Sequence, residues 1–213
     1  MDATRFLHEL PALFEDFPRS ELPRDPRFVK ILDRLDGLAC ANNLALLNLA
    51  ASLLDPGECY VEIGSFKGAS LAAAMLGNEG NEFVAIDSFA LAGGSRARLE
   101  ANLRSFDLEP PEILEGDVFE LLEGGALEGR RLGACYWDLL HRYEPQLAGL
   151  RALEPYLAPG ALVIVDDSDW AEVERALADY VASEPRARRL VELGGERHGR
   201  PWWWEGMVVL AWG

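Results

Sequence analysis

Cysteine is scarce in this sequence, and its scarcity argues against a cysteine-ligated zinc fold and against a small fold held together by disulfides. Three cysteines occur among 213 residues, at Cys40, Cys59 and Cys135. Their spacing matches no zinc-binding motif, and an odd number fits poorly with a disulfide framework. We therefore expect three reduced thiols, a cytoplasmic location, and stability that comes from an ordinary hydrophobic core.

Long apolar runs and a surplus of positive charge are missing as well. No uninterrupted apolar run reaches the roughly 18 residues of a membrane-spanning helix, and the acid-bearing segment Met1 to Phe17 does not resemble a signal peptide. Lysine and arginine number 20 against 36 aspartates and glutamates, so the net charge is −16. Because an acidic surface repels phosphate backbones, we expect neither nucleic acid nor a membrane as a partner.

The composition that remains is that of a globular protein with one sizeable core, 49% apolar and 26% charged. The first part of the chain, to about Leu54, has a helical pattern. Asp25-Pro26 predicts a helix start, and a second helix over 42–54 ends at Asp55-Pro56-Gly57. We therefore predict an N-terminal helical extension over 1–55 and a second domain over 56–213.

From position 56 onward, short apolar runs alternate with helical patterns. The expected strands cover residues 59–63, 83–86, 113–114, 134–137, 161–165, 189–193 and 207–212. Strands separated by helices predict a parallel sheet with both faces covered, which is a doubly wound α/β fold. The last two strands have no helical pattern between them, so we expect them to pair antiparallel at one edge.

Acidic residues end or follow nearly every expected strand. In open parallel sheets the ligand binds beyond the carboxyl ends of the strands, and burying several carboxylates there is costly unless cations or donors meet them. Each acid alone is also explained as a helix cap or loop residue, but for the whole set we favour a functional site. The set comprises Glu62, Asp87, Asp117, Asp138, Asp166 and Asp167.

A glycine-bearing loop follows the first expected strand and reads Glu62-Ile63-Gly64-Ser65-Phe66-Lys67-Gly68-Ala69-Ser70. Gly64 permits a sharp turn where a ligand can approach the backbone. The G-x-x-x-G spacing differs from the G-x-G-x-x-G pattern that holds a pyrophosphate. An acid before the glycine suits a ligand with cationic or hydroxyl-bearing parts, and a carboxylate placed like Asp87 can accept from two ribose hydroxyls.

These segments resemble the successive motifs of class I S-adenosylmethionine (SAM)-dependent methyltransferases, from about Pro56 to the end of the chain. The residues that carry the resemblance are 61–70, 85–87, 115–117 and 157–167. It implies a Rossmann-like seven-stranded sheet, mostly parallel with a reversed last strand, and SAM as cofactor. The 62–68 loop would line the methionine part, Asp87 the ribose and Asp117 the adenine amino group. The implied donor-binding set is Glu62, Gly64, Ser65, Gly68, Ser70, Asp87, Ser88, Asp117 and Asp138.

A narrower resemblance covers Tyr136-Trp137-Asp138-Leu139-Leu140-His141-Arg142-Tyr143-Glu144. This segment is similar to that of a small-molecule O-methyltransferase subfamily, methyltransferase 24-like, which includes enzymes acting on antibiotic sugars and is related to catechol-type enzymes. The resemblance implies that Asp138, Asp166 and Asp167 hold Mg²⁺, whose preferred ligands are oxygens. The pair Leu139-Leu140 replaces a polar pair and makes a sugar acceptor less expected.

His141, three residues past Asp138, is the candidate general base, and we take both as catalytic. The alternatives are that His141 packs or caps a helix, and that the aspartates line the donor pocket without a metal. Trp137 and Trp170 are candidate acceptor contacts. Trp202-Trp203-Trp204 either wall the acceptor pocket or fill the core, and no partner is expected for His8 or His198.

The sequence therefore predicts SAM-dependent methyl transfer to a small-molecule acceptor, through a hydroxyl oxygen and with Mg²⁺ as an expected aid. Two alternatives stay open. One is a dinucleotide-binding oxidoreductase, which the missing pyrophosphate pattern disfavours. The other is a non-catalytic SAM-binding module, which His141 beside three aspartates disfavours. We expect residues 1–54 to cover the acceptor site or to form a homodimer contact.

Overall fold

The computed structural model describes residues 1–195 and 202–213. His198 and the rest of the 196–201 segment, which belongs to the expected acceptor region, lie outside the described residues. The helices are α1 (Ala3–Glu9), η1 (Leu10–Leu13), α2 (Arg27–Arg34), α3 (Ala41–Ser52), α4 (Ala69–Met75), α5 (Arg96–Arg104), α6 (Val118–Glu123), α7 (Tyr143–Leu153), η2 (Glu154–Tyr156) and α8 (Ala171–Ser183). The strands are β1 (Cys59–Ile63), β2 (Glu82–Asp87), β3 (Glu112–Glu115), β4 (Leu132–Trp137), β5 (Leu157–Asp166), β6 (Ala187–Leu193) and β7 (Met207–Trp212).

These strands form one seven-stranded sheet in the order β3-β2-β1-β4-β5-β7-β6. The first five run parallel, while β7 pairs antiparallel with both β5 and β6. The expected mostly parallel sheet with a reversed last strand is confirmed, as is the antiparallel β6–β7 pair at one edge. Strand order reverses between β1 and β4, so ligands are expected above the carboxyl ends of these two strands.

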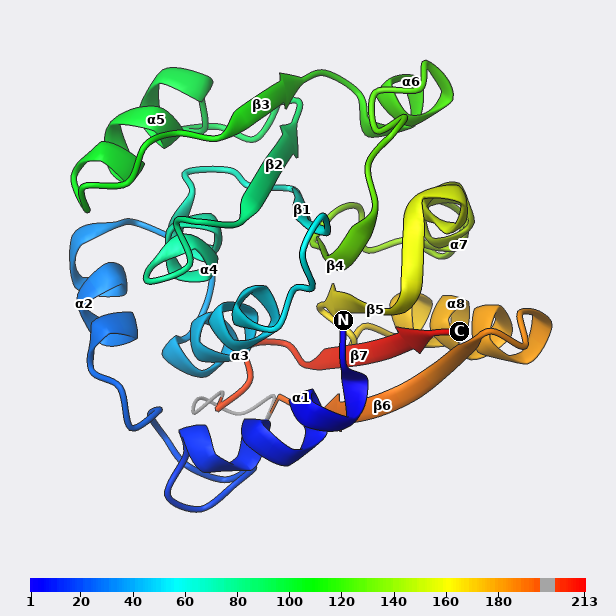
Figure 1. Cartoon of the computed structure of the whole chain (residues 1–213), viewed down its shortest axis with the longest axis horizontal. Coiled ribbons are helices and arrows are strands. Elements are labelled where there is room, and N and C mark those ends of the chain that lie inside the picture. Colours follow the sequence, from blue (N-terminus) through cyan, green and yellow to red (C-terminus); the bar gives the residue numbers. More distant parts are fainter. Residues whose placement is uncertain (196–201) are drawn as a thin grey trace.

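Side chains alternate between two cores, one on each face of the sheet. On β1, Tyr60 packs into the core beneath the N-terminal helices, whereas Val61 and Ile63 pack into the opposite core. Helices α1 to α5 cover the first face and α6, α7 and α8 the second (Figure 1). This two-residue period, with both faces buried, is the physical reason why the strands read as continuous apolar runs.

The N-terminal segment is only partly helical and shares its core with the sheet. Residues 14–26 form no helix, which corrects the helical reading of the whole stretch to Leu54. Helix α2 begins at Arg27, one residue after the expected start, although the Asp25 carboxylate accepts a 2.9 Å hydrogen bond from the Arg27 N–H. Phe14 packs edge-on against Trp203 with ring centroids 5.3 Å apart. The division into an extension and a domain stays a sequence-based prediction.

Two helices beyond β3 differ from the sequence pattern. The short helix α6 is not anticipated by apolar spacing, because it spans too few residues to show a period. Helix α7 begins at Tyr143 and not at Pro145, since the proline lies within its first turn, where its missing N–H costs nothing.

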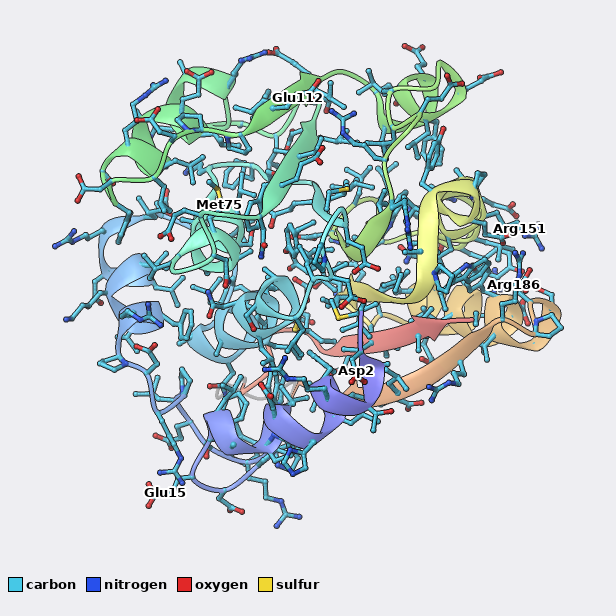
Figure 2. All side chains as sticks on the ribbon, viewed as in Figure 1. Asp2, Glu15, Met75, Glu112, Arg151 and Arg186 are labelled. Carbon is cyan, nitrogen blue, oxygen red and sulfur yellow. The ribbon has the colours of Figure 1, made fainter. Side chains whose placement is uncertain are left out.

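Most of the described charged side chains lie at least partly on the surface, whereas Glu58, Glu62, Asp166 and Asp167 are buried. Charged residues such as Glu15, Arg151 and Arg186 lie at the periphery of the molecule (Figure 2). The three cysteines are free thiols. Within the described residues, every helix is too short or too polar to cross a membrane.

Candidate active site

One cavity of about 700 Å³ opens at the carboxyl ends of the parallel strands. This volume lies within the range of small-molecule binding sites. Its walls come from the loops after β1, β2, β4 and β5, from residues 37–39 and from residues 204–205. The structure brings most of the predicted site residues together there: Gly64, Ser65, Ser70, Asp87, Ser88, Asp138, His141, Asp166 and Asp167.

Gly64 is required by the close approach of two strand ends. Its φ is +91°, and a Cβ built on it would lie 1.9 Å from the Asp138 carbonyl oxygen. The Asp138 N–H donates to the Ile63 carbonyl at 3.0 Å, which draws the two segments together. From the sequence we expect a ligand against this glycine, whereas in the structure the first atoms that a side chain would meet belong to the end of β4.

Asp87 joins the loops that follow β1 and β2. Its carboxylate accepts hydrogen bonds from the Phe66 N–H at 2.6 Å and the Phe89 N–H at 2.5 Å. Each oxygen is used once, and each retains a lone pair for a further donor. Asp87 therefore holds the floor of the cavity in place and can still accept from a ligand.

Glu62 and Gly68 lie behind the cavity wall and not on its surface. The Glu62 side chain is fully buried and accepts from the Ser70 hydroxyl at 2.8 Å and the Tyr60 hydroxyl at 3.2 Å. Burial raises the pKa of Glu62 to about 8, against the pull of these donors. Gly68 starts α4 with a φ of +82° and packs on Leu99.

Asp117 is exposed and lies outside the cavity lining. It is the N-cap of α6, where its carboxylate accepts from the Phe119 N–H at 2.8 Å and the Glu120 N–H at 3.2 Å. This is the capping role that the sequence argument holds open for each acid. The predicted contact of Asp117 with adenine stays a prediction.

Asp138, His141 and Asp167 form a charged cluster at the ends of β4 and β5. The His141 Nε2 lies 2.6 Å from the Asp167 carboxylate and 3.6 Å from that of Asp138. The two carboxylates, with Asp138 foremost, raise the pKa of His141 to about 10. The imidazole therefore carries a proton at neutral pH. Burial raises the pKa of Asp138, and Asp167 adds to the effect.

Asp166 is set deeper than this cluster. Its Oδ2 accepts a hydrogen bond from the hydroxyl of Tyr136, while its Oδ1 is buried and has no partner among the residues that the structure describes. Burial, with help from Asp138 and Asp167, raises the pKa of Asp166 well above its usual range. From the sequence alone we expect no separate role for Tyr136. The available signal is its position two residues before Asp138, which places both on one face of β4.

The acidic end of the cavity fits a divalent cation. Oxygen and nitrogen atoms of Asp138, His141 and Asp167 lie within 4.8 Å of one another, and the unpartnered Oδ1 of Asp166 is a further buried acceptor nearby in sequence. The carboxylate oxygens of this set suit Mg²⁺, whereas an imidazole nitrogen is more typical of zinc, copper, iron or nickel sites. The sequence leads us to expect Asp138, Asp166 and Asp167 as the ligand set. In the structure the clustered ligand atoms belong to Asp138, His141 and Asp167.

A family model described as a methyltransferase domain matches residues 61–168, half of the chain and all of the strands that carry this cluster. The chain belongs to this methyltransferase family. It is a SAM-dependent enzyme, and the oxidoreductase alternative is set aside.

Solved structures with the same fold include three O-methyltransferases. One from Bacillus cereus, in complex with SAH, is 14% identical with a TM-score of 0.64, covering 90% of this chain and 93% of its own. TomG from Streptomyces achromogenes, involved in tomaymycin synthesis and in complex with SAM, is 18% identical with a TM-score of 0.64, covering 100% and 99%. A TDP-rhamnose 3'-O-methyltransferase of calicheamicin biosynthesis is 22% identical with a TM-score of 0.60, covering 99% and 94%. No curated protein matches this sequence.

The aromatic residues of this methyltransferase are divided between core and cavity. Trp137 is fully buried on the α7 side and donates to the Gln146 side chain at 3.1 Å, so the expectation that it contacts the acceptor is wrong. Trp170 lines the cavity as expected and is 47% exposed. Of the tryptophan triplet, Trp203 fills the core and Trp204 lines the cavity.

Proposed function

We propose that this methyltransferase transfers the methyl group of SAM to a hydroxyl oxygen of a small molecule. The observation that carries the proposal is the Asp138–His141–Asp167 cluster, which opens into the same cavity as the Gly64 loop. A group that can hold or accept a proton beside the donor pocket is what oxygen methylation requires. The names of the three structural neighbours described above, each an O-methyltransferase, support the same reaction.

On the donor side, we propose that Asp87 accepts from the ribose hydroxyls through its remaining lone pairs. The loop from Gly64 to Gly68 would follow the methionine part, with Ser65 and Ser70 at its polar end. Ser88, which lines the cavity beside Asp87, would contact the nucleoside. Glu62 would act through Ser70, whose hydroxyl it holds at 2.8 Å, and Asp117 would approach the adenine from the exposed rim.

On the acceptor side, the chemistry is an in-line displacement on an already activated methyl group. The protein must mainly orient the attacking oxygen and take its proton. We propose His141 as the proton acceptor, with Asp167, 2.6 Å from its Nε2, and Asp138, at 3.6 Å, orienting the ring. This role needs a neutral imidazole, whereas the two carboxylates favour the charged form. The balance of charge around His141 therefore controls its competence as a base.

Asp138 and Asp167, joined by Asp166, are the residues that would hold Mg²⁺. When bound, the ion would supply positive charge that lowers the pKa of the acceptor hydroxyl. A neutral imidazole carries a proton on one nitrogen and has a free lone pair only on the other. If that lone pair binds a cation, none is left to accept a proton, so His141 is either a ligand or the base. We assign it the base and leave the ion to the three aspartates.

The test is a methyl-transfer assay with SAM and a library of hydroxyl compounds, run in EDTA and with restored Mg²⁺. We expect transfer to oxygen, lost in EDTA and recovered with Mg²⁺. Full activity in EDTA would show that the reaction needs no divalent ion, and His141 and Asp138 would then be the only catalytic residues proposed. For His141→Ala, a rate that excess Mg²⁺ restores would identify His141 as a ligand, whereas a rate that stays low supports the base.

We propose that the N-terminal segment covers the acceptor site. The support for this is that residues 37–39 form part of the cavity wall. Asp36 pairs with Lys67 of the donor loop at 2.5 Å and so joins this wall to the donor side. The homodimer contact and the cytoplasmic location stay predictions.

A further inference from the structure

The exposed hydrophobic residues of this protein are concentrated in one place. Among the described residues, seven large apolar side chains are exposed, and five of them line the cavity. The five are Leu38, Leu91, Leu140, Trp170 and Trp204. Exposed apolar surface that gathers at a concave site marks a place where a ligand or partner is bound.

Three of the five belong to the acidic end of the cavity. Leu140 follows β4, Trp170 follows β5, and Trp204 precedes β7, and these three strands are neighbours in the sheet. Leu91 follows β2, on the donor side. We call Leu140, Trp170 and Trp204 the apolar wall.

Leu140 is held in an unfavourable backbone conformation. Its φ is +49°, in the left-handed region that a leucine rarely adopts, and its side chain is 49% exposed. Neither the strain nor the exposure stabilises the fold. Three other non-glycine residues of the cavity lining also have positive φ, namely Phe66, Asp167 and Glu205. Strain of this kind is typical of ligand-binding positions.

The apolar wall touches the proposed proton acceptor. The Trp170 indole lies 5.2 Å from the His141 ring, centroid to centroid, and His141 contacts Asp167 at 2.6 Å. A flat molecule lying on the indole would therefore bring a ring substituent to the charged cluster. This geometry suits an aromatic body with a hydroxyl at its edge, since aromatic rings stack on one another with centroids about 4.5–7 Å apart.

The charges of the lining disfavour an anionic acceptor. Among the described lining residues, five acids face two cations, and both cations already have carboxylate partners. Lys67 pairs with Asp36, and its side chain is only 13% exposed. A diphosphate placed here would meet carboxylates and find no unpaired side-chain cation among these residues. A Mg²⁺ held by Asp138, Asp166 and Asp167 would bring two positive charges to three carboxylates, so this end of the cavity would stay negative.

We propose that Leu140, Trp170 and Trp204 form the acceptor subsite, and that it takes the uncharged, planar, aromatic body of a hydroxyl compound and rejects sugar nucleotides. This inference rests on the proposed function and specifies its acceptor. The wall supplies the apolar contact, and the cluster of Asp138, His141 and Asp167 meets the hydroxyl.

The first experiment measures binding without chemistry. Calorimetric titration of the SAH-loaded protein with a naphthol should give binding, and titration with TDP-rhamnose should give none at the same concentrations. Trp170→Ala should weaken naphthol binding about tenfold, and Trp170→Phe should restore most of it. Binding of TDP-rhamnose in preference to naphthol, or of neither compound, overturns the inference.

Leu140→Asn separates a ligand contact from a structural role. Asparagine tolerates the left-handed conformation better than leucine, so the variant should be as stable as the wild type or more stable. If Leu140 contacts the acceptor, the KM for naphthol should nevertheless rise about tenfold while kcat changes little. Leu22→Ala, at a similarly exposed leucine outside the cavity (56% against 49% for Leu140), is the matched control. An unchanged KM in Leu140→Asn counts against the subsite.

These outcomes are distinguishable from failure of the proposed function. If oxygen methylation is wrong, SAM yields no methylated oxygen with any compound, whether or not naphthol binds to the apolar wall. If only the subsite is wrong, methyl transfer to some other hydroxyl compound persists, and Trp170→Ala and Leu140→Asn leave the KM for that compound unchanged.

Discussion

The acidic residues on the two sides of the cavity differ in their hydrogen-bond and charge partners. On the β1–β2 side, Asp87 accepts two backbone hydrogen bonds and Glu62 accepts two from hydroxyls. On the β4–β5 side, Asp138 and Asp167 both lie against one histidine, and one oxygen of Asp166 has no partner within residues 1–195 and 202–213. On the first side both carboxylates have hydrogen-bond donors, and among the described residues only the Ser65 hydroxyl there is buried without a partner. The carboxylates of the second side are short of positive charge.

This difference indicates a division of labour. A satisfied set of hydrogen bonds holds its loops in a fixed geometry, as binding a constant cofactor requires. Crowded carboxylates, strained backbone and exposed indole rings are costly in the free protein, and ligands that relieve them bind in preference. We therefore expect substitutions on the two sides to separate donor affinity from turnover.

The largest effect should come from the β4–β5 side. His141→Ala should lower kcat by about 10²–10⁴-fold, the usual range for a general base, and leave SAH affinity unchanged. The measurement combines steady-state methyl transfer with calorimetry, and exposed His8→Ala is the control. A variant that loses SAH binding together with kcat would show that the two sides are not separable.

Gly64→Ala should give the next largest effect, on donor binding and stability together. The added Cβ would lie 1.9 Å from the Asp138 carbonyl oxygen, so the β1 and β4 ends must separate. We expect SAH affinity to fall about a hundredfold and the melting temperature to drop. Gly57→Ala has a similar positive φ but no neighbour within 4 Å of the new Cβ, so it should cost only about 1–2 kcal/mol of stability. Equal losses in the two variants would rule out the contact as the cause.

Asp87→Ala should weaken SAH binding by roughly tenfold to a hundredfold, which corresponds to about 1.5–3 kcal/mol for a charged hydrogen bond. Its kcat at saturating SAM should change less. Asp117→Ala is the informative companion, because it removes a helix cap worth about 1 kcal/mol of stability. If Asp117→Ala also weakens SAH binding, the adenine contact holds. If only stability falls, Asp117 is a cap alone.

The smallest effect should be a change in the pH dependence of stability from Glu62→Gln. In the folded protein burial raises the pKa of Glu62 from 4.5 to about 8. The unfolded chain therefore releases this proton first, and the wild type loses stability as pH rises from about 4.5 to 8. Urea unfolding across this range should show a smaller loss for the variant. Parallel curves for the variant, the wild type and an exposed Glu123→Gln control would mean that Glu62 is ionised in the fold.

Much of this architecture could be predicted because its signals are local. The apolar run 161–165 predicts a buried strand, and the acid after each run predicts a shared edge, since parallel neighbours end at the same side. The ends of helices, and the presence of very short helices, were harder to predict from the sequence. Helix α6 is too short to show a period, and its cap, Asp117, has the same sequence signature as a ligand-binding acid.

The sequence by itself determined the alternation of strands and helices, the glycine turn after β1 and the row of acids at one edge, because each depends on residues close together in the chain. Only the tertiary structure decided that Trp137 packs beneath α7 while Trp170 faces the cavity, and that His141 joins Asp138 and Asp167 while Asp166 bonds Tyr136. The direction of each side chain depends on which face of a strand it occupies and on loop dihedrals such as the positive φ of Asp167. Those are set by packing between elements that lie far apart in the sequence.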